Sequence, residues 1–135
     1  KIKFYNLKNF IIKRPVSPKN LKKILFNADS FFITLKKGKG LSKTLPAKFQ
    51  TYISFGKPII TFSVGIIKKF IEKYGLGFKI NYKNELKIVK KIISIKRLNN
   101  KQLIKIKQKS NKLYRQEFDL GNNCKKLNNY FKELI

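Results

Sequence analysis

A short segment bounded by proline and glycine constrains this chain more than any other feature of its sequence. Residues 44–58 read TLPAKFQTYISFGKP. Pro46 suits the first turn of a helix, because an N–H has no helical partner there and the φ of proline is already near the helical value. Gly56 suits the left-handed position just past a helix end, and Pro58 prevents the helix from resuming. The large side chains between them recur at helical spacing and are expected to pack on a sheet: Phe49, Tyr52 and Ile53.

An apolar run and a basic glycine turn come just before this helix. Ser30–Leu35 (SFFITL) is typical of a strand, and its successive large apolar residues indicate a strand covered on both faces, as in a parallel α/β sheet. Lys36–Gly40 (KKGKG) follows it. Strand, glycine turn and helix N-terminus in this order can hold a phosphate on backbone N–H groups, with Lys36, Lys37 and Lys39 nearby. A charged turn is more often a solvated loop, so both interpretations stay open.

The amino-terminal part extends the alternation of strands and helices. Asn9–Ile12 (NFII) is the first expected strand. Ser17 and Pro18 predict a helix start, because serine caps well and proline fits the first helical position. We expect that helix to end near residues 27–29. Its inward side chains are predicted to be Leu21, Ile24 and Leu25.

The segment after the bounded helix continues the pattern. We expect strands at Pro58–Phe62 (PIITF) and Gly77–Ile80 (GFKI), and between them a helix, Ile66–Tyr74, closed by Gly75. Its inward side chains are predicted to be Ile67, Phe70 and Ile71. Strands and helices joined by short connections predict an α/β fold with a doubly wound parallel sheet.

In such a sheet, ligands bind beyond the carboxyl ends of the strands. Leu35–Lys43 and Ser63–Ile66 are the loops expected there.

Strand signals stop at Asn84, and the rest of the chain predicts helices. The expected inward residues are Leu86, Val89 and Ile93 in Asn84–Ile95, and Leu103, Ile106 and Leu113 in Lys101–Tyr114. Asp119 is an expected N-cap for the last segment. That segment carries one apolar stripe: Leu120, Cys124, Leu127, Phe131 and Leu134. A stripe of this kind normally packs on a core, which we expect to be an amino-terminal domain outside this chain.

Composition narrows the possible functions. The 135 residues include 33 Lys+Arg and 6 Asp+Glu, a formal net charge of +27, which favours an anionic partner such as nucleic acid, an anionic membrane or a phosphorylated ligand. Arginine, the residue suited to bidentate phosphate and guanine contacts, occurs only at Arg14, Arg97 and Arg115. The lysines are spread along the whole chain, and an AT-rich genome explains part of their excess. Nucleic acid is therefore the less favoured partner.

Other chemistry is disfavoured by what the sequence lacks. It has no histidine and a single cysteine, Cys124, which argues against zinc sites and histidine acid–base catalysis in this segment. The longest nearly apolar run, Pro58–Ile67, is too short to span a bilayer. There is no methionine, so we expect a processed chain or a fragment of a longer protein.

The run ADSFFITLKKGKGLSKTLPAKFQTYISFGKPIITFSVG at 28–65, followed by IIKKFIEKYGLGF, resembles the carboxyl-terminal domain of GT-B glycosyltransferases of glycosyltransferase family 4. The branch it resembles is that of bacterial amino-sugar transferases of O-antigen and capsule synthesis. The matching positions are Ala28, Asp29, Leu35, Gly40, Thr44, Pro46, Ala47, Lys48, Tyr52, Gly56, Lys57 and Pro58, with Tyr74–Phe78 beyond them. The similarity extends from Asn9 to Ile80 and is loose after that.

The resemblance implies one half of a two-domain enzyme that transfers a sugar from a nucleotide-sugar, here expected to be UDP-linked, to a lipid-linked or saccharide acceptor. Residues 1–82 would form a partial Rossmann-like nucleotide-sugar-binding core, and 83–135 a helical tail of the same domain. The missing amino-terminal domain would hold the acceptor, so this segment should carry no catalytic residue, metal or cofactor and be inactive alone. A cytoplasmic protein, peripheral on the inner face of an anionic membrane, is expected.

The resemblance also implies which residues bind the donor. They are Gly40, Leu41, Thr44, Pro46, Ala47, Lys48 and Gln50. Thr44–Lys48 would line the diphosphate and ribose, and Gln50 stands where many relatives carry a glutamate that binds the ribose hydroxyls. An amide can still donate and accept those hydrogen bonds. Relatives read Gly-Glu after the next strand, whereas Ile66 follows Gly65 here, so a carboxylate that helps to seat the donor is absent.

Two other interpretations stay open. The charge of +27 is also compatible with a small nucleic-acid-binding protein, such as a ribosomal component. The departures from the family pattern are compatible with an inactive homologue. Salt dependence separates the first of these from a donor-binding domain, because a nucleic-acid binder loses affinity in proportion to the phosphates it contacts.

Overall fold

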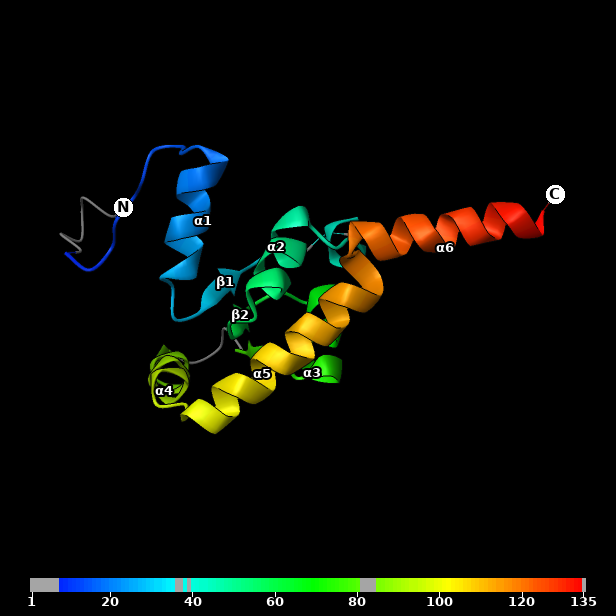
Figure 1. Ribbon diagram of the computed structural model, residues 1–135. Coiled ribbons are helices and arrows are strands. Elements are labelled where there is room, and N and C mark those ends of the chain that lie inside the picture. The colour runs from blue at the N-terminus through cyan, green and yellow to red at the C-terminus, as the bar shows by residue number, and fades with distance from the viewer. Residues whose placement is uncertain (1–7, 36–37, 39, 81–84, 135) are drawn as a thin grey trace.

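The computed structural model describes residues 8–35, 38, 40–80 and 85–134 (Figure 1). It is an α/β protein with a small parallel sheet. Its elements are α1 (Pro18–Phe26), β1 (Phe31–Ile33), the 3-10 turn η1 (Leu41–Lys43), α2 (Ala47–Phe55), β2 (Ile59–Thr61), α3 (Ile66–Tyr74), β3 (Gly77–Lys79), α4 (Glu85–Lys96), α5 (Asn100–Leu113), the π-helical turn η2 (Tyr114–Phe118) and α6 (Leu120–Glu133).

The sheet has the order β1-β2-β3, and both pairs are parallel. In the register, Phe32 lies beside Ile60 and Ile60 beside Phe78. Helices α2 and α3 are the two crossovers, which confirms the predicted alternation from Ser30 to Ile80. The strand order does not reverse among the described residues, so α2 and α3 cover the same face, as right-handed crossovers in one direction must. The parallel α/β class is confirmed, and a doubly wound sheet stays a prediction.

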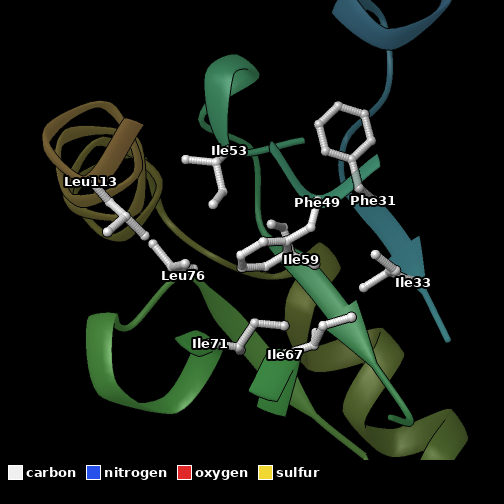
Figure 2. Packing of buried hydrophobic residues seen from close by; sticks show 9 residues of the cluster. All are labelled: Phe31, Ile33, Phe49, Ile53, Ile59, Ile67, Ile71, Leu76 and Leu113. Carbon is white, nitrogen blue, oxygen red and sulfur yellow. The ribbon is translucent and has the colours of Figure 1, made fainter. Parts of the chain in front are cut away.

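The main core lies on the face that α2 and α3 cover (Figure 2). Phe49 and Ile53 of α2 are completely buried there, and Tyr52 is half-buried. The full cluster is Phe31, Ile33, Phe49, Ile53, Ile59, Ile67, Ile71, Leu76 and Leu113. Leu113 comes from α5, which packs on α2 and α3. The helical segment after residue 84 therefore contributes to the same core as the strands.

The opposite face of the sheet is only partly covered. Ile60 and Ile80 pack with Ile95 of α4 in a smaller cluster. Phe32 points to this face and is 50% exposed, although its ring meets that of Phe62 edge-on. The prediction that the first strand is covered on both faces is therefore wrong at Phe32, because α4 packs over β2 and β3 and not over β1.

The ends of α2 follow the proline and glycine that bound it. Gly56 is left-handed at φ 66°, and its N–H donates to the carbonyl of Ile53. A Cβ at Gly56 would lie 3.2 Å from the Cα of Lys107, so glycine also lets α5 cross closely over the end of α2. Pro46 is the N-cap, one residue before the predicted position. Helix α3 has the predicted bounds and ends at Gly75.

The predicted strand at Asn9–Ile12 is wrong. Phe10, Ile11 and Ile12 are exposed and join no described strand, and Asn9 lies in a turn. A strand needs a neighbour to accept its backbone hydrogen bonds, and the sheet of the described residues provides none there.

Helix α1 begins as predicted, with the Ser17 Oγ accepting from the N–H of Asn20 at 3.4 Å. Leu25 packs on the core, whereas Leu21 and Ile24 are exposed and not buried as predicted.

The predicted buried face of α4 is also wrong. Leu86, Val89 and Ile93 are exposed, and Ile88 and Ile95 face the sheet instead. The apolar residues of α4 cover about half of its circumference, so spacing did not define which part of that half packs on the sheet. The ammonium of Lys91, 4.5 Å from the ring centre of Phe78, lies on the side that packs.

The carboxyl-terminal helices carry strong local start signals. Asn99 and Gln102 form a reciprocal capping box at the start of α5, and Ile106 and Leu113 are buried as predicted. The Asp119 side chain caps α6 by accepting from the N–H of Asn122 at 2.9 Å. Within the described ranges, no helix is long and apolar enough to cross a membrane.

Candidate functional site

The residues predicted to bind a donor lie on one continuous path at the carboxyl edge of the sheet. Gly40 precedes η1, Leu41 begins it and Thr44 ends it. Pro46 then caps α2, and the first turn of that helix follows directly. Along this path the exposed members of the predicted set are Gly40, Thr44, Ala47, Lys48 and Gln50, whereas Pro46 is half-buried.

Helices α2 and α3 both begin at this edge without a side-chain cap. Pro46 has no side-chain group that accepts a hydrogen bond, and neither has Gly65, the N-cap of α3. By contrast, α1, α5 and α6 are capped by Ser17, Asn99 and Asp119. The first N–H groups of a helix have no partner within it, and they carry the positive end of the helix dipole. Two such ends at one edge form a surface suited to an anion.

A close contact joins the turn η1, which precedes α2, to the start of α3. The carbonyl of Ser42 in η1 lies against the α-carbon of Gly65, which has φ 86° and ψ −143°. A side chain at position 65 would overlap the Ser42 backbone. The Ser42 Oγ donates to the carbonyl of Gly38 at 2.9 Å, which closes the turn before η1.

Two buried hydroxyls also join the loops. The N–H of Leu35, just after β1, donates to the Oγ of Ser63 at 2.7 Å. The N–H of Ser63 in turn donates to the Oγ1 of Thr61 at 2.9 Å. Thr61 and Ser63 are both buried. These contacts fix the loop after β1 to the loop after β2, and so position both helix starts.

Sequence reasoning placed Ser42, Ser63 and Gly65 in the two loops expected at this edge, but it did not identify the contacts that these residues and Thr61 make there. One sequence feature could have indicated these contacts: Thr61 and Ser63 are polar residues inside the otherwise apolar run 58–67. A hydroxyl in a buried strand normally has a hydrogen-bond partner, and the nearest loop was the place to seek one.

The edge is electropositive. No Asp or Glu occurs between Asp29 and Glu72 in the sequence, and Lys43 and Lys48 are exposed on the path. At the end of β3, the ammonium groups of Lys79 and of Lys68 each lie 3.9 Å from a different oxygen of Glu72. A hydrogen bond with Lys68, burial and the Lys68 charge lower the pKa of Lys79, and Glu72 partly opposes this. Lys36, Lys37 and Lys39 lie outside the described residues.

Two cavities among the described residues lie away from this edge. One of about 420 Å³ separates α1 from α2, and one of about 750 Å³ is bounded by Asp29, Lys57 and residues of α4 and α5. None of the predicted donor residues lines either of them. No group of three or more His, Cys, Asp or Glu suited to a metal ion occurs among the residues that the structure describes. The candidate site is thus a surface of N–H groups, hydroxyls and lysines.

Comparisons with models of known protein families, with curated proteins and with solved structures find no match to this chain.

Proposed function

We propose that this chain is the donor-binding part of a glycosyltransferase and that it holds the diphosphate of a nucleotide-sugar between the starts of α2 and α3. The observation that carries the proposal is the presence of two helix N-termini without side-chain caps at the carboxyl edge of a parallel sheet, with the turn before α2 in contact with the start of α3 through Ser42 and Gly65. Ligands of open α/β sheets bind beyond the carboxyl ends of the strands. The sequence resemblance gives the same segment the same role.

Each residue on the path has a chemical task in this proposal. The N–H groups that open α2 and α3 donate to the phosphate oxygens. Lys48, exposed in the first turn of α2, supplies a positive charge beside them. Gln50 offers both a donor and an acceptor to the ribose hydroxyls. Thr44, at the entrance to α2, is exposed toward the same surface.

The transfer step needs an acceptor that this segment is not expected to bind. By resemblance, a second domain presents a lipid-linked or saccharide acceptor in cytoplasmic synthesis of surface polysaccharide. The absence of a carboxylate after Gly65 means that backbone N–H groups and lysines carry the whole task of seating the donor. Binding by this chain alone is therefore expected to be weak and not to lead to turnover.

Titration of the chain with UDP and UDP-N-acetylglucosamine, followed by amide shifts in NMR, tests the proposal. We expect saturable shifts at Gly40–Gln50 and Gly65–Lys68, larger for UDP than for GDP or inorganic phosphate. A control titration with single-stranded RNA is run over a range of salt concentrations. Tight RNA binding that falls steeply with salt, without shifts for UDP, would overturn the proposal in favour of a nucleic-acid-binding protein.

A further inference from the structure

The cavity of about 750 Å³ lies at the amino edge of the sheet, opposite to the candidate donor site. Its walls come from the end of α1, the turn into β1, the segment that joins α2 to β2, and helices α4 and α5. Figure 1 shows these elements around the amino ends of β1 and β2. Helix α4 packs over β2 and β3 and leaves the start of β1 uncovered, which makes room for the cavity. Its volume is in the range of small-molecule sites, about 300–1,000 Å³.

The walls of this cavity are mostly apolar. Its large apolar side chains include Phe26, Ile60, Ile92, Ile95, Leu103 and Ile104. Three of them, Phe26, Ile92 and Ile104, are exposed to solvent. Apolar surface gains free energy when a ligand removes it from water. The walls therefore favour a ligand with a hydrocarbon chain.

Three ammonium groups accompany the apolar walls. Lys57, Lys96 and Lys107 line the cavity, together with one acidic residue, Asp29. Lys57 is half-buried, and its Nζ donates to the carbonyl of Phe26 at 2.8 Å. An ammonium has three N–H donors, so Lys57 can bind this carbonyl and a ligand at the same time. The lining thus has an excess of positive charge, and one of its cations is held in place.

The crossing of α5 over the end of α2 brings a second cation to the wall that carries Lys57. The side chain of Lys107 lies against Gly56, the residue before Lys57, where a Cβ would come 2.8 Å from the Lys107 Cγ. Glycine at this position therefore allows the close crossing. Like charges on one wall repel each other, and a bound anion relieves that repulsion.

We propose that this cavity binds a medium-chain fatty acid, with the hydrocarbon chain along Ile60 and Ile104 and the carboxylate at Lys57 and Lys107. Apolar walls with a few fixed cations suit a ligand that has one apolar and one anionic end. A nucleotide fits poorly, because the lining offers few side chains that could pair with the polar edge of a base. The inference does not depend on the donor site, which lies at the other edge of the sheet.

Titration with sodium decanoate below its micelle-forming concentration, followed by NMR, tests the proposal. We expect saturable shifts of the methyl groups of Ile60, Ile95 and Leu103. Decyltrimethylammonium has the same chain with a cationic head and should bind at least about tenfold more weakly. Hexanoate has the same head with a shorter chain and should also bind more weakly. Equal binding of decanoate and hexanoate, shifts that do not saturate, or shifts that appear only with micelles or phospholipid vesicles would each overturn the proposal.

Matched variants separate the cavity from the overall charge of the chain. Lys107→Gln should weaken decanoate binding about three- to tenfold, whereas Lys105→Gln, exposed on the same helix outside the lining, should leave it unchanged. Ile104→Asp should weaken binding about tenfold or more, and Leu86→Asp, at an exposed apolar residue of α4 outside the lining, should not. All four positions are exposed, and circular dichroism checks that each variant folds. Equal losses within either pair would mean that decanoate responds to net charge, and would overturn the proposal.

Discussion

The backbone N–H of Leu35 donates to the buried Oγ of Ser63, with 2.7 Å between nitrogen and oxygen, across 28 residues of sequence. This bond joins the loop that leaves β1 to the loop that leaves β2. Because Ser63 is itself held by the Oγ1 of Thr61, the loop before α2 is tied to the sheet by polar contacts. The starts of α2 and α3 thus depend on two hydroxyl groups for their relative position.

Replacing Ser63 by alanine should destabilise the protein by about 1–3 kcal/mol, because the part-buried N–H of Leu35 loses its acceptor. Urea unfolding monitored by circular dichroism measures the change. Ser54→Ala is the matched control, since Ser54 is exposed and bonds only within α2. Ser54→Ala should lower the free energy of unfolding by less than about 1 kcal/mol. Equal losses for the two variants would contradict the role assigned to Ser63.

Gly65→Ala should destabilise by at least about 1–3 kcal/mol, because φ 86° is unfavourable for alanine and its Cβ would meet the carbonyl of Ser42. The amide of Ser42 should also shift strongly in NMR spectra, since η1 must move. Gly40→Ala is the control: φ is −84° there and a Cβ meets no atom within 4 Å. Unchanged stability of Gly65→Ala would show that the two loops are not in contact.

Alanine substitutions at the neighbouring Phe31 and Phe32 of β1 should differ sharply in their effect on the free energy of unfolding. Phe31→Ala removes a ring that is 4% exposed and stacks on Tyr52 at 4.4 Å, and should cost about 3–5 kcal/mol. Phe32→Ala alters the open face of the sheet and should cost less than about 1.5 kcal/mol. Thermal and urea unfolding provide the comparison. A large loss at Phe32 would mean that its face of the sheet is covered in solution.

Burial raises the pKa of the Tyr52 phenol above its ordinary value of 10.0. Below pH 10 the phenol is neutral in the folded and unfolded states, and its contribution to stability is complete. As the pH rises from there through the folded-state pKa, the unfolded chain loses the proton first, so the free energy of unfolding falls. Tyr52→Phe retains the stacked ring and should show a shallower alkaline fall in urea unfolding. Lysine ionisation is common to both proteins, so identical profiles would contradict the raised pKa.

Lys48→Ala should weaken UDP binding about three- to tenfold without changing the free energy of unfolding, because an exposed ammonium contributes charge to the site and not packing. Lys105→Ala, at an exposed position of α5, is matched in net charge. Amide-shift titrations of both variants give the affinities. If both lose affinity equally, UDP responds to the overall charge and not to the start of α2.

Local signals predicted the elements well where the backbone itself was constrained. The bounds of α2 and α3 were predicted from Pro46, Gly56 and Gly75. The starts of α1 and α6 were predicted from the capping residues Ser17 and Asp119. These features act within a few residues, so they can be read without knowledge of the neighbours.

Side-chain burial was predicted less well wherever it depended on a partner distant in sequence. The predicted packing face of α4 was wrong because the apolar residues of that helix cover about half of its circumference, and contact with Ile60, Phe78 and Ile80 decided which part of that half packs. The strand at Asn9–Ile12 was wrong because no described strand lies beside it. The hydrogen bond of Ser63 was not predicted because its partner, Leu35, lies on another loop.

The sequence by itself determined the order of strands and helices from Ser30 to Ile80, the segment that opens α2 and the amphipathic character of α6, because these follow from backbone preferences and short-range spacing. Only the tertiary structure decided that the turn before α2 meets the start of α3 through Ser42 and Gly65, and that the side chain of Phe32 is half exposed. Those outcomes depend on how elements far apart in the chain pack and hydrogen-bond, and short-range sequence patterns do not specify such long-range contacts.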